Sequence, residues 1–130
     1  DNFTTTIQTA KHNFIADEPA LIGGDDFGPS PYDFLSAGLA ACTVMTLKMY
    51  AERKKWDLQE VYAHMTYSKK HSDDLMLDLD KPSRIDHLSK KLTFVGNLDA
   101  SQRERLKQIA SKCPVHKTLQ NDIIIDTELT

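Results

Sequence analysis

The chain has 130 residues and a formal net charge of −3, with 16 Lys and Arg against 19 Asp and Glu. This length suits a single domain, residues 1–130, and 40% hydrophobic with 27% charged residues is typical of a folded protein. The slight acidity argues against nucleic acid as a partner, because proteins that bind phosphate backbones usually carry surplus positive charge. Two cysteines are too few for a secreted disulfide scaffold and suit a reducing, cytoplasmic compartment.

The most apolar stretch, Phe34 to Leu47, argues against a membrane partner or span. Small and polar residues interrupt it, and it ends at Lys48. It is shorter than the roughly 20 apolar residues that a membrane-spanning helix needs. No signal peptide is visible, although the chain begins at Asp1 rather than at Met.

The N-terminal part predicts two short strands and a loop. Residues 3–9 are rich in β-forming side chains, and Phe14–Ile15 fit a second strand that ends before Pro19. Residues 22–30 hold three of the five glycines and a proline, which predicts a loop with special backbone positions.

A long helix follows this loop. Ser30 can cap it, Pro31 suits its first position, and Asp33 lies three residues after the serine, as in a capping box. The helical pattern continues to about Lys54, and its middle is apolar nearly all round. Such a helix is buried on most sides, so we expect it to be the central helix of the fold.

Two further strands are predicted in the second half. Residues 58–67 alternate between apolar and polar side chains, which is typical of a half-buried strand. Residues 72–83 are acidic and predict an irregular loop, and residues 84–95 predict another, weakly periodic strand.

A second helix is predicted from Asp99, which can cap it with Gln102 three residues later. This helix has one apolar face, because its apolar side chains recur at helical spacing. That face comprises Leu106, Ile109, Ala110 and Cys113. Pro114 disfavours helical geometry at the residue before it, so the helix should end or kink at Cys113.

Residues 115–121 predict a turn, and residues 122–129 alternate cleanly, which predicts a last strand. The expected order is ββ-α-β-β-α-β. Strands on both sides of one long buried helix predict an α+β domain.

Two cysteines could carry chemistry. Cys42 lies in the middle of the long helix, where a thiol is more often a small core residue than a reactive group. Cys113 ends one helix, and Pro114 can open another, so the thiol can occupy an N-cap position. Lys112 and His116 add positive charge, which lowers the pKa of a thiol. A structural role for Cys113 on the apolar face is equally compatible with the pattern.

A metal site is not expected. Cys113 and His116 have the spacing of half a zinc site, but the sequence offers no matching second half. Asp33 is most simply the capping residue of the long helix.

Two segments carry distinctive motifs: residues 28–56 contain GPSPY and AACT, and residues 84–119 end in CPVHKTL. Both segments closely resemble the OsmC/Ohr family of stress-inducible redox proteins. The resemblance extends from about His12 to Thr127. The sequence looks more like the OsmC-like branch than like the organic hydroperoxide resistance proteins proper.

The resemblance implies an OsmC-like α+β fold in which two β-sheets surround the long central helix of an intertwined homodimer. It implies that Cys42 is the peroxidatic cysteine and Cys113 the resolving cysteine. Cys42 would attack a hydroperoxide and become a sulfenic acid, which Cys113 would convert to a disulfide. An external dithiol would reduce this disulfide, and no metal or organic cofactor is required.

The family also implies an N-terminal arginine and a glutamate ten residues before the first cysteine. Here the N-terminal region offers Lys11 and His12, and the acid position holds Tyr32, followed by Asp33. These four residues and His116 are the five candidate supporting residues of the site.

Whether the protein is an enzyme is therefore left open. The first hypothesis is a thiol-dependent peroxidase that reduces organic hydroperoxides. The alternative is a non-catalytic dimeric module that binds a small apolar or thiol-reactive ligand near Cys42, under a roof formed by residues 22–30. A redox sensor on the same fold is a third possibility.

Overall fold

The computed structural model describes residues 2–71 and 84–130, so the predicted acidic loop at 72–83 lies outside the described residues. The chain forms two compact units, one ending at Ala37 and one beginning at Gly38. The expectation of a single domain stays a prediction.

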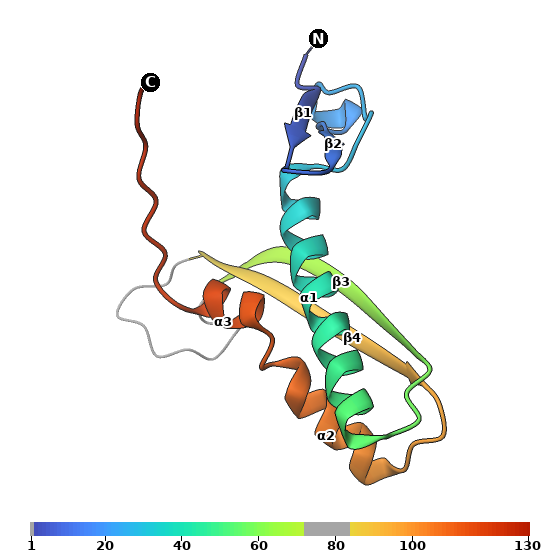
Figure 1. Ribbon diagram of the computed structural model, residues 1–130. Coiled ribbons are helices and arrows are strands. Elements are labelled where there is room, and N and C mark those ends of the chain that lie inside the picture. Colours follow the sequence, from blue (N-terminus) through green and yellow to red (C-terminus); the bar gives the residue numbers. More distant parts are fainter. Residues whose placement is uncertain (1, 72–83) are drawn as a thin grey trace. The chain divides into compact units, whose positions relative to one another are not determined.

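The first unit contains the two predicted N-terminal strands (Figure 1). Strand β1 (Thr5–Gln8) pairs with β2 (Asn13–Ala16) in an antiparallel hairpin. A short 3-10 helix, η1 (Ala20–Ile22), follows and leads into the predicted loop at 22–30. The buried carboxylate of Asp17 organises this region because it accepts hydrogen bonds from the Thr4 hydroxyl and from two backbone N–H groups.

Helix α1 (Pro31–Lys54) begins and ends where the sequence predicts. The backbone N–H of Ser30 donates to the Asp33 carboxylate at 3.0 Å, and the Asp33 N–H donates to the Ser30 hydroxyl at 3.3 Å. This reciprocal pair is the predicted capping box. By length and composition alone, α1 is the one helix among the described residues that could cross a membrane, a test that core helices of soluble proteins also pass.

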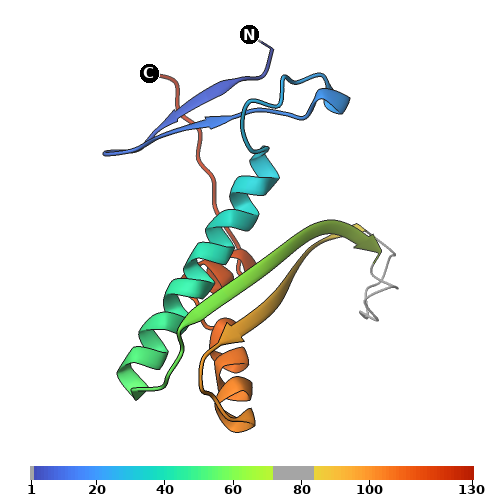
Figure 2. The ribbon, with the colours of Figure 1, turned by 90° about the vertical axis from the view of Figure 1, so that its right-hand side faces the viewer.

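The second unit is built on a long antiparallel hairpin (Figure 2). Strand β3 (Glu60–His71) pairs with β4 (Arg84–Val95), in a register that places Glu60 opposite Val95. Exposure alternates along residues 61–67 of β3, which confirms the predicted period. The strand starts and ends later than the predicted 58–67.

Two helices complete the second unit. Helix α2 (Ala100–Ala110) carries the predicted capping box, in which Asp99 and Gln102 exchange hydrogen bonds. Helix α3 (Pro114–Gln120) lies where the sequence predicts a turn at 115–121. The prediction of a turn is wrong, whereas the expectation that Pro114 opens a helix is confirmed, because Pro114 takes the first helical position, where its missing N–H costs nothing.

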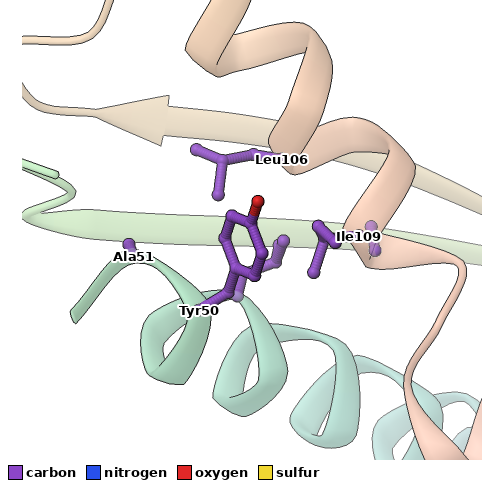
Figure 3. Close-up of a cluster of buried hydrophobic side chains, with 6 residues drawn as sticks. Tyr50, Ala51, Leu106 and Ile109 are labelled. Atoms are coloured by element: carbon purple, nitrogen blue, oxygen red, sulfur yellow. The ribbon is translucent and has the colours of Figure 1, made fainter. Parts of the chain in front are cut away.

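The core of the second unit lies between α1, α2 and the hairpin. Figure 3 shows Tyr50 and Ala51 of α1 facing Leu106 and Ile109 of α2. Leu47 and Leu106 are completely buried, and partly buried side chains of the hairpin and its flanks pack against this cluster. These flanking side chains are Trp56, Leu58, Val61, Leu92, Phe94 and Leu98.

Within one chain, α1 is buried on one face rather than on most sides. Its buried residues are Leu39, Thr43, Leu47, Tyr50 and Ala51. On other faces Met45 and Met49 are 60% and 66% exposed. The physical reason is that the hairpin and α2 of the same chain can cover only one side of a helix.

The predicted last strand at 122–129 is wrong for the single chain. These residues form no helix or strand, and Ile123, Ile124 and Ile125 are 54%, 88% and 82% exposed. Alternation predicts a strand, but a strand also needs a neighbour to accept its backbone hydrogen bonds. The described part of this chain supplies no such neighbour.

Candidate functional site

The second unit brings the two cysteines together. Cys42 lies in the middle of α1, and Cys113 lies in the link between α2 and α3. Both thiols are free and lie within hydrogen-bonding reach of each other. The backbone N–H of Val115 also donates to Cys42 Sγ at 3.5 Å, which holds the start of α3 against α1. Cys113 is completely buried, whereas Cys42 is partly exposed.

Cys113 occupies the predicted N-cap position of α3. Its backbone is extended, with φ −67° and ψ 146°, and its Sγ accepts a hydrogen bond from the backbone N–H of His116 at 3.3 Å. Sulfur thus takes the place of the oxygen that usually caps a helix. His116 contacts Cys113 through its backbone N–H and not through its imidazole.

Thr43 links the two cysteine-bearing segments. Its hydroxyl donates to the Leu39 carbonyl at 2.8 Å and lies 3.6 Å from Cys113 Sγ. A hydroxyl has one proton, so it cannot donate to both groups at once. While it donates to Leu39, it can only accept from the Cys113 thiol; to stabilise a thiolate, it must turn toward the sulfur.

The surroundings of Cys113 favour its ionised form. Burial by itself would raise the pKa of the thiol, but contacts with Thr43, the His116 N–H and Cys42, together with the charge of Lys90, hold the pKa of Cys113 below its ordinary value.

Lys90 of the hairpin contacts the chain segment that leads to Cys113. Its ammonium donates to the Ala110 carbonyl at 2.8 Å, at the end of α2 and three residues before Cys113. Burial lowers the pKa of Lys90, while the charges of Cys113 and Cys42 act in the opposite direction.

His116 lies between the cysteines and a cavity of about 420 Å³. Its Nδ1 is buried and has no hydrogen-bond partner among the residues that the structure describes. Burial and the nearby charge of Lys90 lower the pKa of His116, so the imidazole is neutral near neutral pH. The cavity wall combines apolar with polar and charged side chains, namely Leu39, Asp86, His87, Leu88, Lys90, His116, Leu119 and Gln120.

The other predicted site residues belong to the first unit. Lys11 and His12 lie in the turn between β1 and β2, where the His12 N–H donates to the Thr9 hydroxyl. Tyr32 and Asp33 lie in the first turn of α1, and Asp33 caps it. Any role of these four residues beside Cys42, like the predicted roof at 22–30, stays a prediction.

The sequence reasoning missed Thr43 and Lys90. Thr43 stands next to Cys42, but a helical threonine carries no signal of its own. Lys90 is one of two adjacent lysines on a predicted strand, and the sequence does not distinguish it from Lys91. Among the described residues, no group of three or more His, Cys, Asp or Glu is placed to hold a metal ion.

Comparison with known proteins gives the context for this site. Residues 23–128 match the protein family described as OsmC-like protein. No curated protein matches the chain.

Several solved structures share the fold. An OsmC-like protein from Mycoplasma pneumoniae is 19% identical, with a TM-score of 0.69 over 90% of this chain and 79% of that one. An organic hydroperoxide resistance protein OsmC from Legionella pneumophila is 16% identical, with a TM-score of 0.64 over 92% and 89%. The organic hydroperoxide resistance protein OhrB of Bacillus subtilis is 18% identical, with a TM-score of 0.56 over 94% and 92%. The family match covers most of the sequence, and the chain therefore belongs to the OsmC-like family.

Proposed function

We propose that this protein is a thiol-dependent peroxidase that reduces organic hydroperoxides with Cys42 and Cys113. The observation that carries the proposal is the meeting of two free thiols from α1 and from the start of α3. The difference in burial supports the proposed order, because partly exposed Cys42 is accessible to a substrate and Cys113 is buried.

The proposed reaction has three steps. A thiolate at Cys42 attacks the distal oxygen of the hydroperoxide, the O–O bond breaks, and the alkoxide takes a proton to leave as an alcohol. The Cys113 thiolate then attacks the sulfur of the Cys42 sulfenic acid, which forms a disulfide and, with one proton, releases water. An external dithiol reduces the disulfide by thiol exchange, through a mixed disulfide.

Structural relatives support the substrate class. Two of the structures that share this fold are described as organic hydroperoxide resistance proteins. At 16% and 18% identity they support the fold directly, and the activity of this chain is our extension from the cysteine pair.

We further propose that the active protein is a soluble, cytoplasmic homodimer. A single chain leaves apolar residues of α1, such as Met45 and Met49, exposed. It also leaves the apolar segment 123–125 without a strand partner among the described residues. A second copy would cover such surfaces, which water would otherwise solvate at a cost of about 25 cal/mol for each Å².

The cavity beside His116 favours a second candidate function, the binding of a small ligand without chemistry. Its volume of about 420 Å³ is within the range of small-molecule sites, and its wall is partly apolar. In that case the cysteines would be dispensable for binding.

The test is to count free thiols before and after one equivalent of an organic hydroperoxide, and to locate any disulfide by mass spectrometry. We expect rapid loss of both thiols into a Cys42–Cys113 bond. Cys42→Ser should abolish peroxide consumption, whereas Cys113→Ser should still consume one equivalent and stop at the sulfenic acid. Two thiols that persist in excess hydroperoxide would refute the proposal. Saturable ligand binding by a Cys42→Ala, Cys113→Ala variant would then favour the second function.

A further inference from the structure

Lys90 is a half-buried cation without a carboxylate partner. It lies on β4, and its only hydrogen bond within the described part of the chain goes to the backbone carbonyl of Ala110. No ion pair joins it to an Asp or Glu of residues 2–71 or 84–130. A desolvated charge without a counter-charge is costly, so such a lysine requires an anion nearby.

The thiols are candidates to supply this anion, because the charges that act on Lys90 come from Cys113 and Cys42. Glu104 of α2 lines a cavity with Lys90, but within the described residues it forms no ion pair with the ammonium. The hydrogen bond to Ala110 fixes the ammonium at the end of α2, where the chain turns to Cys113. Lys90 and His116 also line one cavity, and the His116 N–H binds Cys113 Sγ.

Resting on the proposed function, we propose that Lys90 is the positioning residue that keeps Cys113 as a thiolate, ready to resolve an oxidised Cys42. Lys90 then acts on the second step of the reaction. Its ammonium stabilises the attacking sulfur of Cys113, whereas the hydroperoxide reacts with Cys42 in the first step. The step requires no further reactant, because the thiolate displaces hydroxide from the sulfenic acid and one proton converts it to water.

The neighbouring groups are compatible with this role. His116 is neutral near neutral pH, so it does not compete with Lys90 for the thiolate. Asp86 lines the same cavity but pairs with Lys69 at 3.6 Å. The titratable and charged groups that face Lys90 include Asp86, His87 and His116 in one cavity, Arg103, Glu104 and Lys107 of α2 in another, and the thiols of Cys113 and Cys42.

The test measures thiolate directly. In a Cys42→Ser background, Cys113 is the one remaining thiol, and its ionisation is followed by ultraviolet absorbance during a pH titration. Lys90→Met should move this titration to higher pH, and Lys90→Arg should restore it. The matched control is Lys91→Met: Lys91 is the next residue on β4, is exposed, and should leave the titration unchanged.

Kinetics give a second readout with both cysteines present. After one equivalent of hydroperoxide, Lys90→Met should form the disulfide about tenfold more slowly near neutral pH, because removal of one charge at a half-buried site reduces the thiolate fraction. Consumption of the hydroperoxide itself should change less.

The two proposals fail in different ways. If Lys90→Met titrates like its parent, Lys90 does not hold the thiolate, whatever the peroxidase assay shows. If the wild type does not react with hydroperoxide, the proposed function fails, while the titration still decides the role of Lys90.

Discussion

The hydroxyl of Thr43 offers a sharp test of how the cysteine pair works. Thr43 is completely buried, and its single hydroxyl proton serves either the Leu39 carbonyl or Cys113 Sγ. Hydrogen bonds to an ionised partner are roughly twice as strong as neutral ones. We therefore expect the hydroxyl to turn from Leu39 to the sulfur when Cys113 ionises.

Thr43→Val removes the hydroxyl and nearly preserves the shape of the side chain. The lost bond to Leu39 contributes about 1 kcal/mol to the free energy of unfolding. For a protein of this size, that corresponds to a decrease in Tm of about 4 °C. The thiolate of Cys113 loses one donor, and a difference of about 1 kcal/mol between thiolate and thiol slows disulfide formation about fivefold.

The assay combines thermal unfolding with stopped-flow measurement of disulfide formation after one equivalent of hydroperoxide. Thr46→Val is the matched control, because Thr46 lies on the same helix and is less buried. Thr43→Ser keeps the hydroxyl and should keep the rate. If Thr43→Val loses stability but forms the disulfide at the wild-type rate, the hydroxyl stays on the Leu39 carbonyl. That result would falsify the coupling between Thr43 and Cys113.

Two further variants test the core and the electrostatics of the site. Leu106→Ala, at a completely buried position, should lower the free energy of unfolding by about 2–5 kcal/mol in denaturant titrations. Leu21→Ala, at a 99% exposed side chain, should leave it unchanged, and equal effects would contradict the assigned core. Because the pKa of folded His116 lies below that of an unfolded histidine, protons bind the unfolded chain first, and stability falls as pH drops below about 6.5. His116→Gln should reduce this loss, and an unchanged pH profile of Tm would refute the role of His116.

The sequence predicts best those elements whose signals are local. Ser30 with Asp33 and Asp99 with Gln102 are capping boxes, in which both partners lie within one helical turn, and both form as predicted. The N-cap position of Cys113 follows in the same way from Pro114 at the next position. Such contacts depend on a few neighbouring residues, so the rest of the fold cannot easily override them.

Elements that need a distant partner are predicted less well. The alternation at 122–129 is a true β pattern, yet no strand forms there, because within the described residues none lies alongside to accept its hydrogen bonds. The apolar pattern of α1 likewise overstates its burial in one chain. Both differences have one physical cause: a sequence pattern records which surfaces avoid water but not which molecule covers them. The second copy of our proposed homodimer would cover both surfaces.

The charge at the cysteine pair illustrates the same limit. The family resemblance directs attention to the N-terminal region, where Lys11 and His12 stand instead of an arginine. Among the described residues, Lys90 is a cation whose charge acts on Cys113, and it lies far from either cysteine in sequence. Its place depends on the register of the β3–β4 hairpin and on where α2 ends, since the Ala110 carbonyl anchors the ammonium. No spacing rule connects a strand lysine to a helix terminus, so this lysine becomes a candidate only after the hairpin has been packed against α2. In our proposal the charge that favours the Cys113 thiolate comes from β4 and not from the first unit, and the Lys90 titration measures that contribution directly.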